Sequence, residues 1–180
     1  MLAITFMLSL SCSRQDSGGD PLRVIFDTDM GNDIDDALAL AMLNNYVDLD
    51  MADLLAVISS KDHPYSAKYI DLLNTWYGHG NIPIGVVVKG KKPQDSKYAN
   101  PVVDMEKDGV PVFKRSMSDE TVLPEAVDLY RSLLASSPDS SVVIITVGVS
   151  TNIARLIESG PDEHSPLSGM ELVSQKVALM

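Results

Sequence analysis

Short apolar runs rich in β-branched residues alternate along the chain with longer segments in which apolar residues recur every three or four positions. The first pattern is typical of buried strands, and the second is typical of helices that pack on one side. The predicted strands are residues 22–27, 53–59, 82–88 and 141–148, and the predicted helices are residues 33–46, 64–78, 122–138, 150–160 and 169–177. This alternation predicts an α/β domain of Rossmann-like type, with a largely parallel sheet and flanking helices.

The predicted helices carry apolar stripes that we expect to face the core. In helix 33–46 the stripe consists of Ile34, Ala37, Leu38, Ala41 and Met42, widened by Leu40 and Leu43. Trp76 and Tyr77 end the second helix at apolar spacing, so we expect them to pack in the core as well. Residues 89–119 are polar and contain several prolines, which predicts a long surface excursion between two elements.

The last three residues, 178–180, form an apolar stretch typical of the opening of another strand. A chain that stops inside a buried strand would leave its parallel sheet incomplete. We therefore expect residues 21–180 to form an α/β domain that is incomplete at its C-terminus, as in a fragment of a longer protein.

An apolar run, residues 1–11, precedes the single cysteine of the chain, Cys12. The run is too short to span a bilayer as a helix and is typical of an export signal. Small residues before Cys12 resemble a bacterial lipoprotein signal, in which the cysteine is lipidated after cleavage; the alternative is a free thiol in an ordinary N-terminus. Residues 1–20 are thus expected to be a signal and a polar tether. The protein would be exported to the cell envelope and lipid-anchored on the periplasmic or outer-membrane side.

The chain is acidic, with 25 Asp and Glu against 14 Lys and Arg and a formal net charge of -11. This charge argues against nucleic acid or an anionic membrane surface as the main partner, so membrane contact is expected only through the lipid anchor. An acidic surface is compatible with a cation site.

Five aspartates crowd the junction between the first predicted strand and the first predicted helix: Asp27, Asp29, Asp33, Asp35 and Asp36. One or two of them would serve as a helix cap or interact with the helix dipole. Two carboxylates about 4 Å apart repel by roughly 4 kcal/mol at an effective dielectric constant near 20, so the whole cluster predicts a bound cation or protonated members. No His or Cys lies nearby, which disfavours zinc, whereas calcium and magnesium both fit an all-oxygen site.

The order of residues in this cluster carries a family resemblance. The chain reads Asp27-Thr28-Asp29-Met30-Gly31 and then, after three residues, Asp35-Asp36-Ala37. It resembles the signature of the nucleoside hydrolases (the inosine/uridine-preferring family), with two residues inserted before the Asp-Asp pair. A second segment, Gly148 to Ala154, resembles a later motif of the same family. The resemblance covers residues 22–180, roughly the N-terminal half of a typical member, and implies a truncated nucleoside hydrolase fold.

The resemblance implies hydrolysis of the N-glycosidic bond of a ribonucleoside to base and ribose, with one tightly bound Ca²⁺. By position, Asp29 resembles the general base and a metal ligand, and Asp36 resembles a second metal ligand. Val147 stands where a backbone carbonyl binds the metal. Asp35 resembles the residue that binds ribose hydroxyls, a role that the insertion also opens to Asp33. Asp27 resembles a supporting residue.

Two departures from the family pattern matter. A ribose-binding Asn expected after the second strand is absent, so Ser60, Lys61 or Asp62 would substitute for it. The remaining calcium-binding Asp and the leaving-group acid of the family belong to its C-terminal half. We therefore expect low or no activity from the 180 residues alone, and a homo-oligomer is compatible with this interpretation.

Two other functions compete with hydrolysis. A lipoprotein that captures a nucleoside or sugar without cleaving it would use the same calcium and hydroxyl contacts. The haloacid-dehalogenase-like phosphotransferases also open with Asp-x-Asp after a strand, but Gly31 stands where their loop carries Thr or Val. The retained Asp29 favours the hydrolase, because a binder has no need of a base.

Overall fold

The computed structural model describes residues 19–91 and 95–180. Cys12 and the predicted export signal lie outside the described residues. Within the described ranges, no helix is both long enough and apolar enough to cross a membrane.

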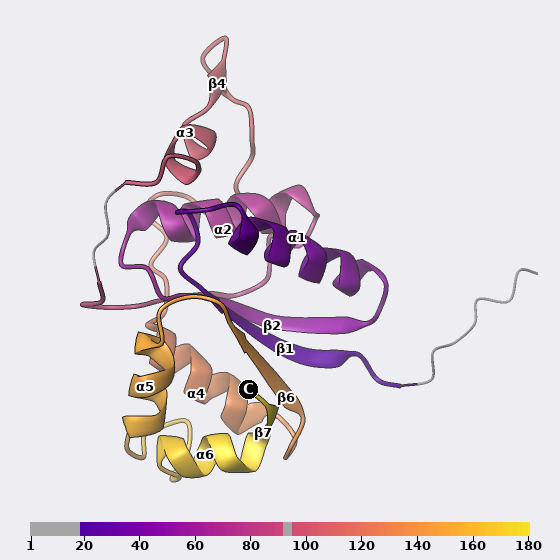
Figure 1. The fold of residues 1–180 in the computed structure, drawn as a ribbon, viewed down its shortest axis with the longest axis vertical. Coiled ribbons are helices and arrows are strands. Elements are labelled where there is room, and N and C mark those ends of the chain that lie inside the picture. Colours follow the sequence, from indigo (N-terminus) through magenta and orange to yellow (C-terminus); the bar gives the residue numbers. More distant parts are fainter. Residues whose placement is uncertain (1–18, 92–94) are drawn as a thin grey trace, which may run out of the picture.

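A five-stranded parallel sheet lies at the centre of the fold, in the order β3-β2-β1-β6-β7 (Figure 1). Its strands are β1 (Leu22–Thr28), β2 (Ala52–Ser59), β3 (Ile84–Val86), β6 (Val142–Thr146) and β7 (Val177–Leu179). The predicted α/β class is confirmed, and the apolar residues at the end of the chain do begin a fifth strand. The third strand is shorter than its apolar run, because Val87 and Val88 already belong to the following loop.

Helices cover both faces of the sheet (Figure 1). On one face lie α1 (Asp35–Asp48) and α2 (Pro64–Trp76), and on the other lie α4 (Ala126–Ser136), α5 (Thr151–Glu158) and α6 (Gly169–Lys176). The central strand alternates between the two cores: Val24 and Phe26 pack with the first group, and Ile25 packs with the second. Strand β1 is therefore buried on both sides, which explains its continuous apolar sequence.

The predicted surface excursion has structure of its own. Helix α3 (Ala99–Val103) packs against α2, and a small hairpin of β4 (Glu106–Lys107) and β5 (Val110–Pro111) projects beyond it (Figure 1). The hairpin turn consists of Asp108 and Gly109, with φ angles of 56° and 76°. Two positive φ angles in a two-residue loop match the twist of the flanking strands, and Asp-Gly is among the sequences that favour such a turn.

The predicted buried stripe of α1 is wrong in part. Ala37, Leu40 and Leu43 are buried, but Leu38 is 62 % exposed, and Ile34 and Met42 are exposed as well. The helix is rotated about its axis because two polar residues, Asp36 and Asn44, also face inward. Asn44 donates to the side chain of Asn74 at 3.1 Å and contacts His79 at 2.7 Å, so its burial is compensated by hydrogen bonds.

Trp76 likewise departs from expectation. It is 68 % exposed and meets Phe113 edge-on, with 5.8 Å between ring centroids. Its helix ends at this residue, where the chain turns away from the core at Gly78.

Candidate functional site

The carboxyl ends of three neighbouring strands bring the two sequence motifs together. The backbone N–H of Val147, just after β6, donates to the carbonyl of Asp27 at 2.9 Å, and that of Ser60, just after β2, donates to the carbonyl of Thr28 at 2.9 Å. Ser60 in turn accepts from the backbone N–H of Val149 at 3.1 Å. The loops after β1, β2 and β6 therefore form one continuous surface, as expected for a site at the carboxyl edge of a parallel sheet.

Gly148 allows the closest approach in this surface. A Cβ atom at this position would lie 2.5 Å from Oγ of Ser60 and 2.8 Å from the carbonyl carbon of Thr28, and closer still to the backbone N of Asp29. A side chain of any size would separate the β6 loop from the end of β1. The close packing of the β6 loop against the end of β1 therefore requires glycine at this position of the second motif.

Asp27 lies at the base of the site and is fully buried. Its Oδ2 accepts hydrogen bonds from the hydroxyl of Tyr130 and from Nδ2 of Asn152, each at 3.1 Å. Burial raises the pKa of Asp27 to about 6, although the hydrogen bonds from Asn152 and Tyr130 and the nearby Ser60 hydroxyl lower it. Its other oxygen, Oδ1, is buried with no hydrogen-bond partner among the described residues, as is Oδ1 of Asn152.

Asp36 is the second buried carboxyl group of the site and lies in the first turn of α1. Its Oδ1 accepts from Oγ1 of Thr28 at 2.8 Å, and the same Thr28 oxygen accepts from the backbone N–H of Met30 at 3.0 Å. Burial raises the pKa of Asp36 to about 6; the Thr28 hydrogen bond lowers it, and the neighbouring carboxylates raise it further.

The remaining aspartates surround Asp36. Carboxylate oxygens of Asp33, Asp35 and Asp36 lie within 4.8 Å of one another. A hydrogen bond with Asp35 is the main cause that raises the pKa of Asp33. Asp29 is half-buried and adds to the negative potential at both Asp33 and Asp36. We call Asp27, Asp29, Asp33, Asp35 and Asp36 the aspartate site.

The donor set of the aspartate site fits a hard divalent cation. It offers carboxylate oxygens from one loop, and the Val147 backbone lies at the same edge. The unpartnered Oδ1 of Asp27 is a buried acceptor of the kind that an ion or water satisfies. Oxygen ligands without His or Cys favour Ca²⁺ or Mg²⁺ over zinc.

Lys61, one of the three candidate substrate contacts, is buried in a way that the sequence did not reveal. It is only 3 % exposed, and its Nζ donates to Oδ1 of Asn32 at 2.7 Å, inside the loop that carries the aspartates. Of the other two candidates for a substrate contact, Ser60 accepts from Val149, and Asp62 accepts from the backbone N–H of Gly90 at 3.1 Å. Ser60 and Lys61 both reach the aspartate site, Ser60 at Asp27 and Lys61 at the loop that contains Asn32.

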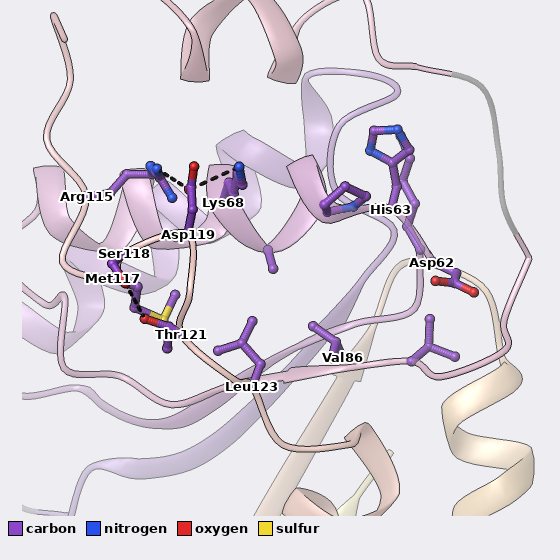
Figure 2. A pocket seen from close by; sticks show the side chains of 14 residues that line it. Asp62, His63, Lys68, Val86, Arg115, Met117, Ser118, Asp119, Thr121 and Leu123 are labelled. Atoms are coloured by element: carbon purple, nitrogen blue, oxygen red, sulfur yellow. Dashed lines mark hydrogen bonds and ion pairs between the residues drawn. The ribbon is translucent and has the colours of Figure 1, made fainter. Parts of the chain in front are cut away.

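Lys61 also lines a cavity of about 360 Å³, which is drawn in Figure 2. The start of α2, the end of β3 and residues 115–123 form its walls, with Val86 and Leu123 at the floor. Asp119 accepts from Arg115 at 2.7 Å and pairs with Lys68 at 3.0 Å across one rim. One carboxylate thus faces two cations at this rim.

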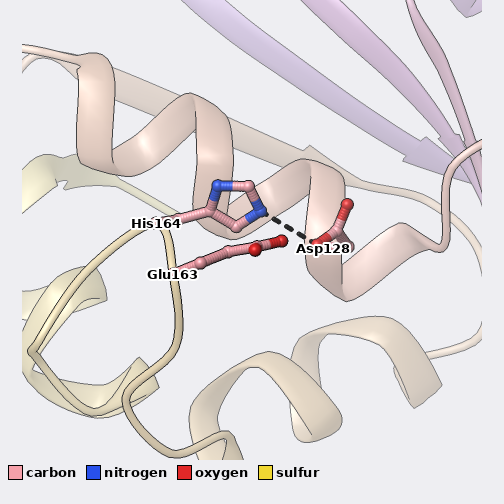
Figure 3. A group of neighbouring side chains, drawn as sticks. All are labelled: Asp128, Glu163 and His164. Carbon is pink, nitrogen blue, oxygen red and sulfur yellow. Dashed lines mark hydrogen bonds and ion pairs between the residues drawn. The ribbon is translucent and has the colours of Figure 1, made fainter.

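A second group of side chains that could bind a metal lies on the opposite face of the sheet from α1 and consists of Asp128, Glu163 and His164 (Figure 3). Nε2 of His164 lies 2.9 Å from Asp128, and this hydrogen bond raises the pKa of His164. Both acids are exposed. An exposed ion pair accounts for this group, so it carries no metal assignment.

The chain matches a known protein family over most of its length. The family model described as inosine-uridine preferring nucleoside hydrolase matches residues 24–170. No curated protein matches the chain.

Solved structures match the fold. The plant nucleoside hydrolase PpNRh1 enzyme is 19 % identical with a TM-score of 0.59, and the match covers 88 % of this chain and 46 % of that one. The type III effector protein XopQ, complexed with adenosine diphosphate ribose, and the effector protein XOO4466 are each 17 % identical with a TM-score of 0.63, over 89 % of this chain and 43 % of theirs. The chain thus spans less than half the length of these structures.

Proposed function

Because the chain belongs to the inosine-uridine preferring nucleoside hydrolase family, we propose that its aspartate site serves the hydrolysis of a ribonucleoside to base and ribose. The observation that carries the proposal is the convergence of the five aspartates at one sheet edge, three of them with oxygens within 4.8 Å of one another. A cluster of this charge density would be unfavourable unless a cation neutralises it during the working cycle.

Asp36, Asp29 and the carbonyl of Val147 would hold Ca²⁺ in this proposal. When bound, Ca²⁺ would position ribose hydroxyls and make a water more acidic. Asp29 is half-buried, so it can contact both the interior of the site and an incoming water. It would act as the general base and accept the proton of that water.

Asp33 and Asp35 would bind the ribose hydroxyls. Both are exposed and lie beside Asp36, so a sugar can reach them without displacing buried side chains. The water oxygen forms a bond to the anomeric carbon, and the bond to the base nitrogen breaks with its electron pair leaving on the base. The base then takes a proton from water or from a group in the second half of the fold. Negative charge around the sugar stabilises the oxocarbenium-like transition state.

Asp27 supports the site from below. Its burial and its hydrogen bonds to Tyr130 and Asn152 tie β1 to α4 and α5. A phosphotransferase would need Asp27 as an accessible nucleophile, and it is fully buried. This observation, together with the family, sets the phosphotransferase hypothesis aside.

Ribose release tests the proposal. The chain would be incubated at high concentration with inosine or uridine in excess Ca²⁺, and free ribose would be measured as reducing sugar. In line with the low or no activity expected of the 180 residues alone, any release should be slow, should be abolished by chelation and should fall to background in Asp29→Asn. Release that is insensitive to Asp29→Asn would contradict the proposed base.

The same experiment separates the alternative of a non-catalytic nucleoside- or sugar-binding protein. Calorimetric titration of a nucleoside into the calcium-loaded chain measures binding independently of cleavage. Binding without any ribose release above that of Asp29→Asn would favour the binder.

We also propose that the protein is exported and lipid-anchored through Cys12. The support is the apolar run of residues 1–11 followed by small residues and the cysteine. Metabolic labelling with a radioactive fatty acid in a bacterial host should mark the wild-type chain and leave Cys12→Ser unlabelled. Equal labelling of both would contradict the anchor.

A further inference from the structure

Lys61 places a buried ammonium inside the loop that carries the aspartates. Its Nζ donates to Oδ1 of Asn32 at 2.7 Å and lies 3.5 Å from where a Cβ of Gly31 would be. Gly31 has a φ angle of 117°, a conformation that side chains rarely adopt, so the backbone passes close to the ammonium there. The cation is thus built into the β1–α1 connection and is not a mobile surface lysine.

The charges around Lys61 are negative. Burial lowers the pKa of Lys61, and the carboxylates of Asp29, Asp95, Asp33 and Asp36 act against this. None of the described carboxylates lies within 4.0 Å of Nζ, so the residue forms no direct ion pair with any one of them in the described structure. It faces the aspartates as a group at slightly longer range.

A buried ammonium is unfavourable unless neighbouring charges and hydrogen bonds compensate it. Here one of its three donors is used by Asn32, and the compensating charge comes from Asp95 and from the carboxylates of the aspartate site. Those carboxylates are also the groups that would bind a divalent cation. Ca²⁺ and the Lys61 ammonium would therefore interact with the same carboxylates, and each would weaken the attraction of these carboxylates for the other.

We propose that Lys61 is a positioning residue of the aspartate site that supplies part of its neutralising charge and thereby sets its affinity for Ca²⁺. The inference rests on the proposed calcium-dependent function. Without Ca²⁺, the ammonium holds the β1–α1 connection together against the repulsion of the aspartates. When Ca²⁺ is present, the ammonium lowers the affinity of the site for Ca²⁺ below the affinity that the same carboxylates would have without Lys61.

Calorimetric titration with Ca²⁺ alone tests the inference. The proteins are the wild type, Lys61→Met, Lys61→Gln and the control Lys114→Met, which removes the same charge at an exposed position. Lys61→Gln keeps a donor for Asn32 and guards against a loss of folding in Lys61→Met. We expect both Lys61 variants to bind Ca²⁺ at least about tenfold more tightly than the wild type, because a nearby like charge has been removed, and Lys114→Met to stay within about twofold.

Thermal unfolding gives a second readout. In chelator, the Lys61 variants should melt below the wild type, and Ca²⁺ should raise their melting temperature more than it raises that of the wild type. A lysine with a merely structural role would lower the melting temperature without tightening Ca²⁺ binding.

The outcomes separate this inference from the proposed function. Unchanged or weaker Ca²⁺ binding by both Lys61 variants overturns the inference while leaving calcium-dependent hydrolysis intact. Binding by neither wild type nor variants overturns both the inference and the calcium dependence. Unchanged Ca²⁺ binding with lost nucleoside binding would make Lys61 a substrate contact and would also overturn the inference. Tighter Ca²⁺ binding supports it whether or not ribose is released.

Discussion

Oγ1 of Thr28 donates to Oδ1 of Asp36 at 2.8 Å, and this bond joins the last residue of β1 to the first turn of α1. Thr28 also accepts from the backbone N–H of Met30, so one buried hydroxyl fixes both the helix start and the turn between. The position of Asp36, the buried carboxyl group of the proposed metal set, therefore depends on a neutral residue eight positions earlier.

Replacing Thr28 tests this dependence. Thr28→Val keeps the shape but leaves Asp36 Oδ1 and the Met30 N–H without their partner. We expect a loss of about 1–3 kcal/mol in the free energy of unfolding, the usual cost of unsatisfied buried groups, and weaker Ca²⁺ binding. Urea denaturation and calorimetry measure the two effects. Thr121→Val, at an exposed position, is the matched control and should change neither.

Arg131 offers a test of stability away from the site. It is buried on α4, donates to both carboxylate oxygens of Asp162, at 2.5 and 2.9 Å, and also donates to the carbonyls of Ser165 and Leu167. Arg131→Met should cost about 1–3 kcal/mol in denaturant unfolding, because it removes a buried guanidinium that pairs with the partly exposed Asp162 and leaves the carbonyls of Ser165 and Leu167 without their donor. Lys68→Met, which breaks an exposed pair with Asp119, should have little effect. Equal losses of unfolding free energy in Arg131→Met and Lys68→Met would contradict the stabilising role of the Arg131 interactions.

The partner of Arg131 predicts a pH dependence. The Arg131 hydrogen bonds lower the pKa of Asp162 to about 2 from its ordinary value of 3.8. A lowered carboxyl pKa contributes stability that is present above pH 3.8 and is lost as the pH falls toward 2. Asp162→Asn should therefore unfold with a shallower acid dependence between pH 4 and 2 than the wild type does. An unchanged slope in acid titrations followed by circular dichroism would exclude this role.

Local patterns predicted the strands and helices, because short β-branched runs and helical periodicity report which segments are buried. They also predicted the aspartate site, since its five members lie within ten residues of sequence. The inward face of α1 was predicted wrongly in part. Leu38 and Met42 have the spacing of core residues, but the hydrogen bonds of Asp36 to Thr28 and of Asn44 to Asn74 set the rotation of the helix.

Contacts between distant segments account for what the sequence did not reveal. Arg131 lies on the predicted helix 122–138, and nothing local shows that Asp162, 31 residues later, will compensate its burial. The sequence offers Lys61 only as one of three candidate substrate contacts, and its burial and its hydrogen bond to Asn32 appear only once β1 and β2 are paired. Charged residues of this kind become visible only after the fold has brought their partners together.

The buried carboxyl group of Asp27 predicts a pH dependence of stability that is opposite in sign to that of Asp162. Burial raises its pKa to about 6 from 3.8, so the folded state binds a proton more tightly than the unfolded state does between these values. This contribution to stability is fully present below pH 3.8 and is lost as the pH rises through 6. Asp27→Asn should remove this part of the pH dependence, as measured by urea denaturation between pH 4 and 7. If Asp27→Asn and the wild type change in parallel over this range, the buried carboxyl is not the source.

Gly148 gives the most direct test of how the two motifs meet. In Gly148→Ala the new methyl group would contact Thr28, Asp29 and Ser60, and two of these are backbone contacts that cannot move aside. The β6 loop must then shift away from β1, which we expect to cost about 1–3 kcal/mol in unfolding free energy and to weaken Ca²⁺ binding. Gly160→Ala is the matched control, because a Cβ there meets no atom within 4 Å. Weakened Ca²⁺ binding in Gly148→Ala but not in Gly160→Ala would tie the second motif to the metal set, whereas equal binding in both would separate the two motifs.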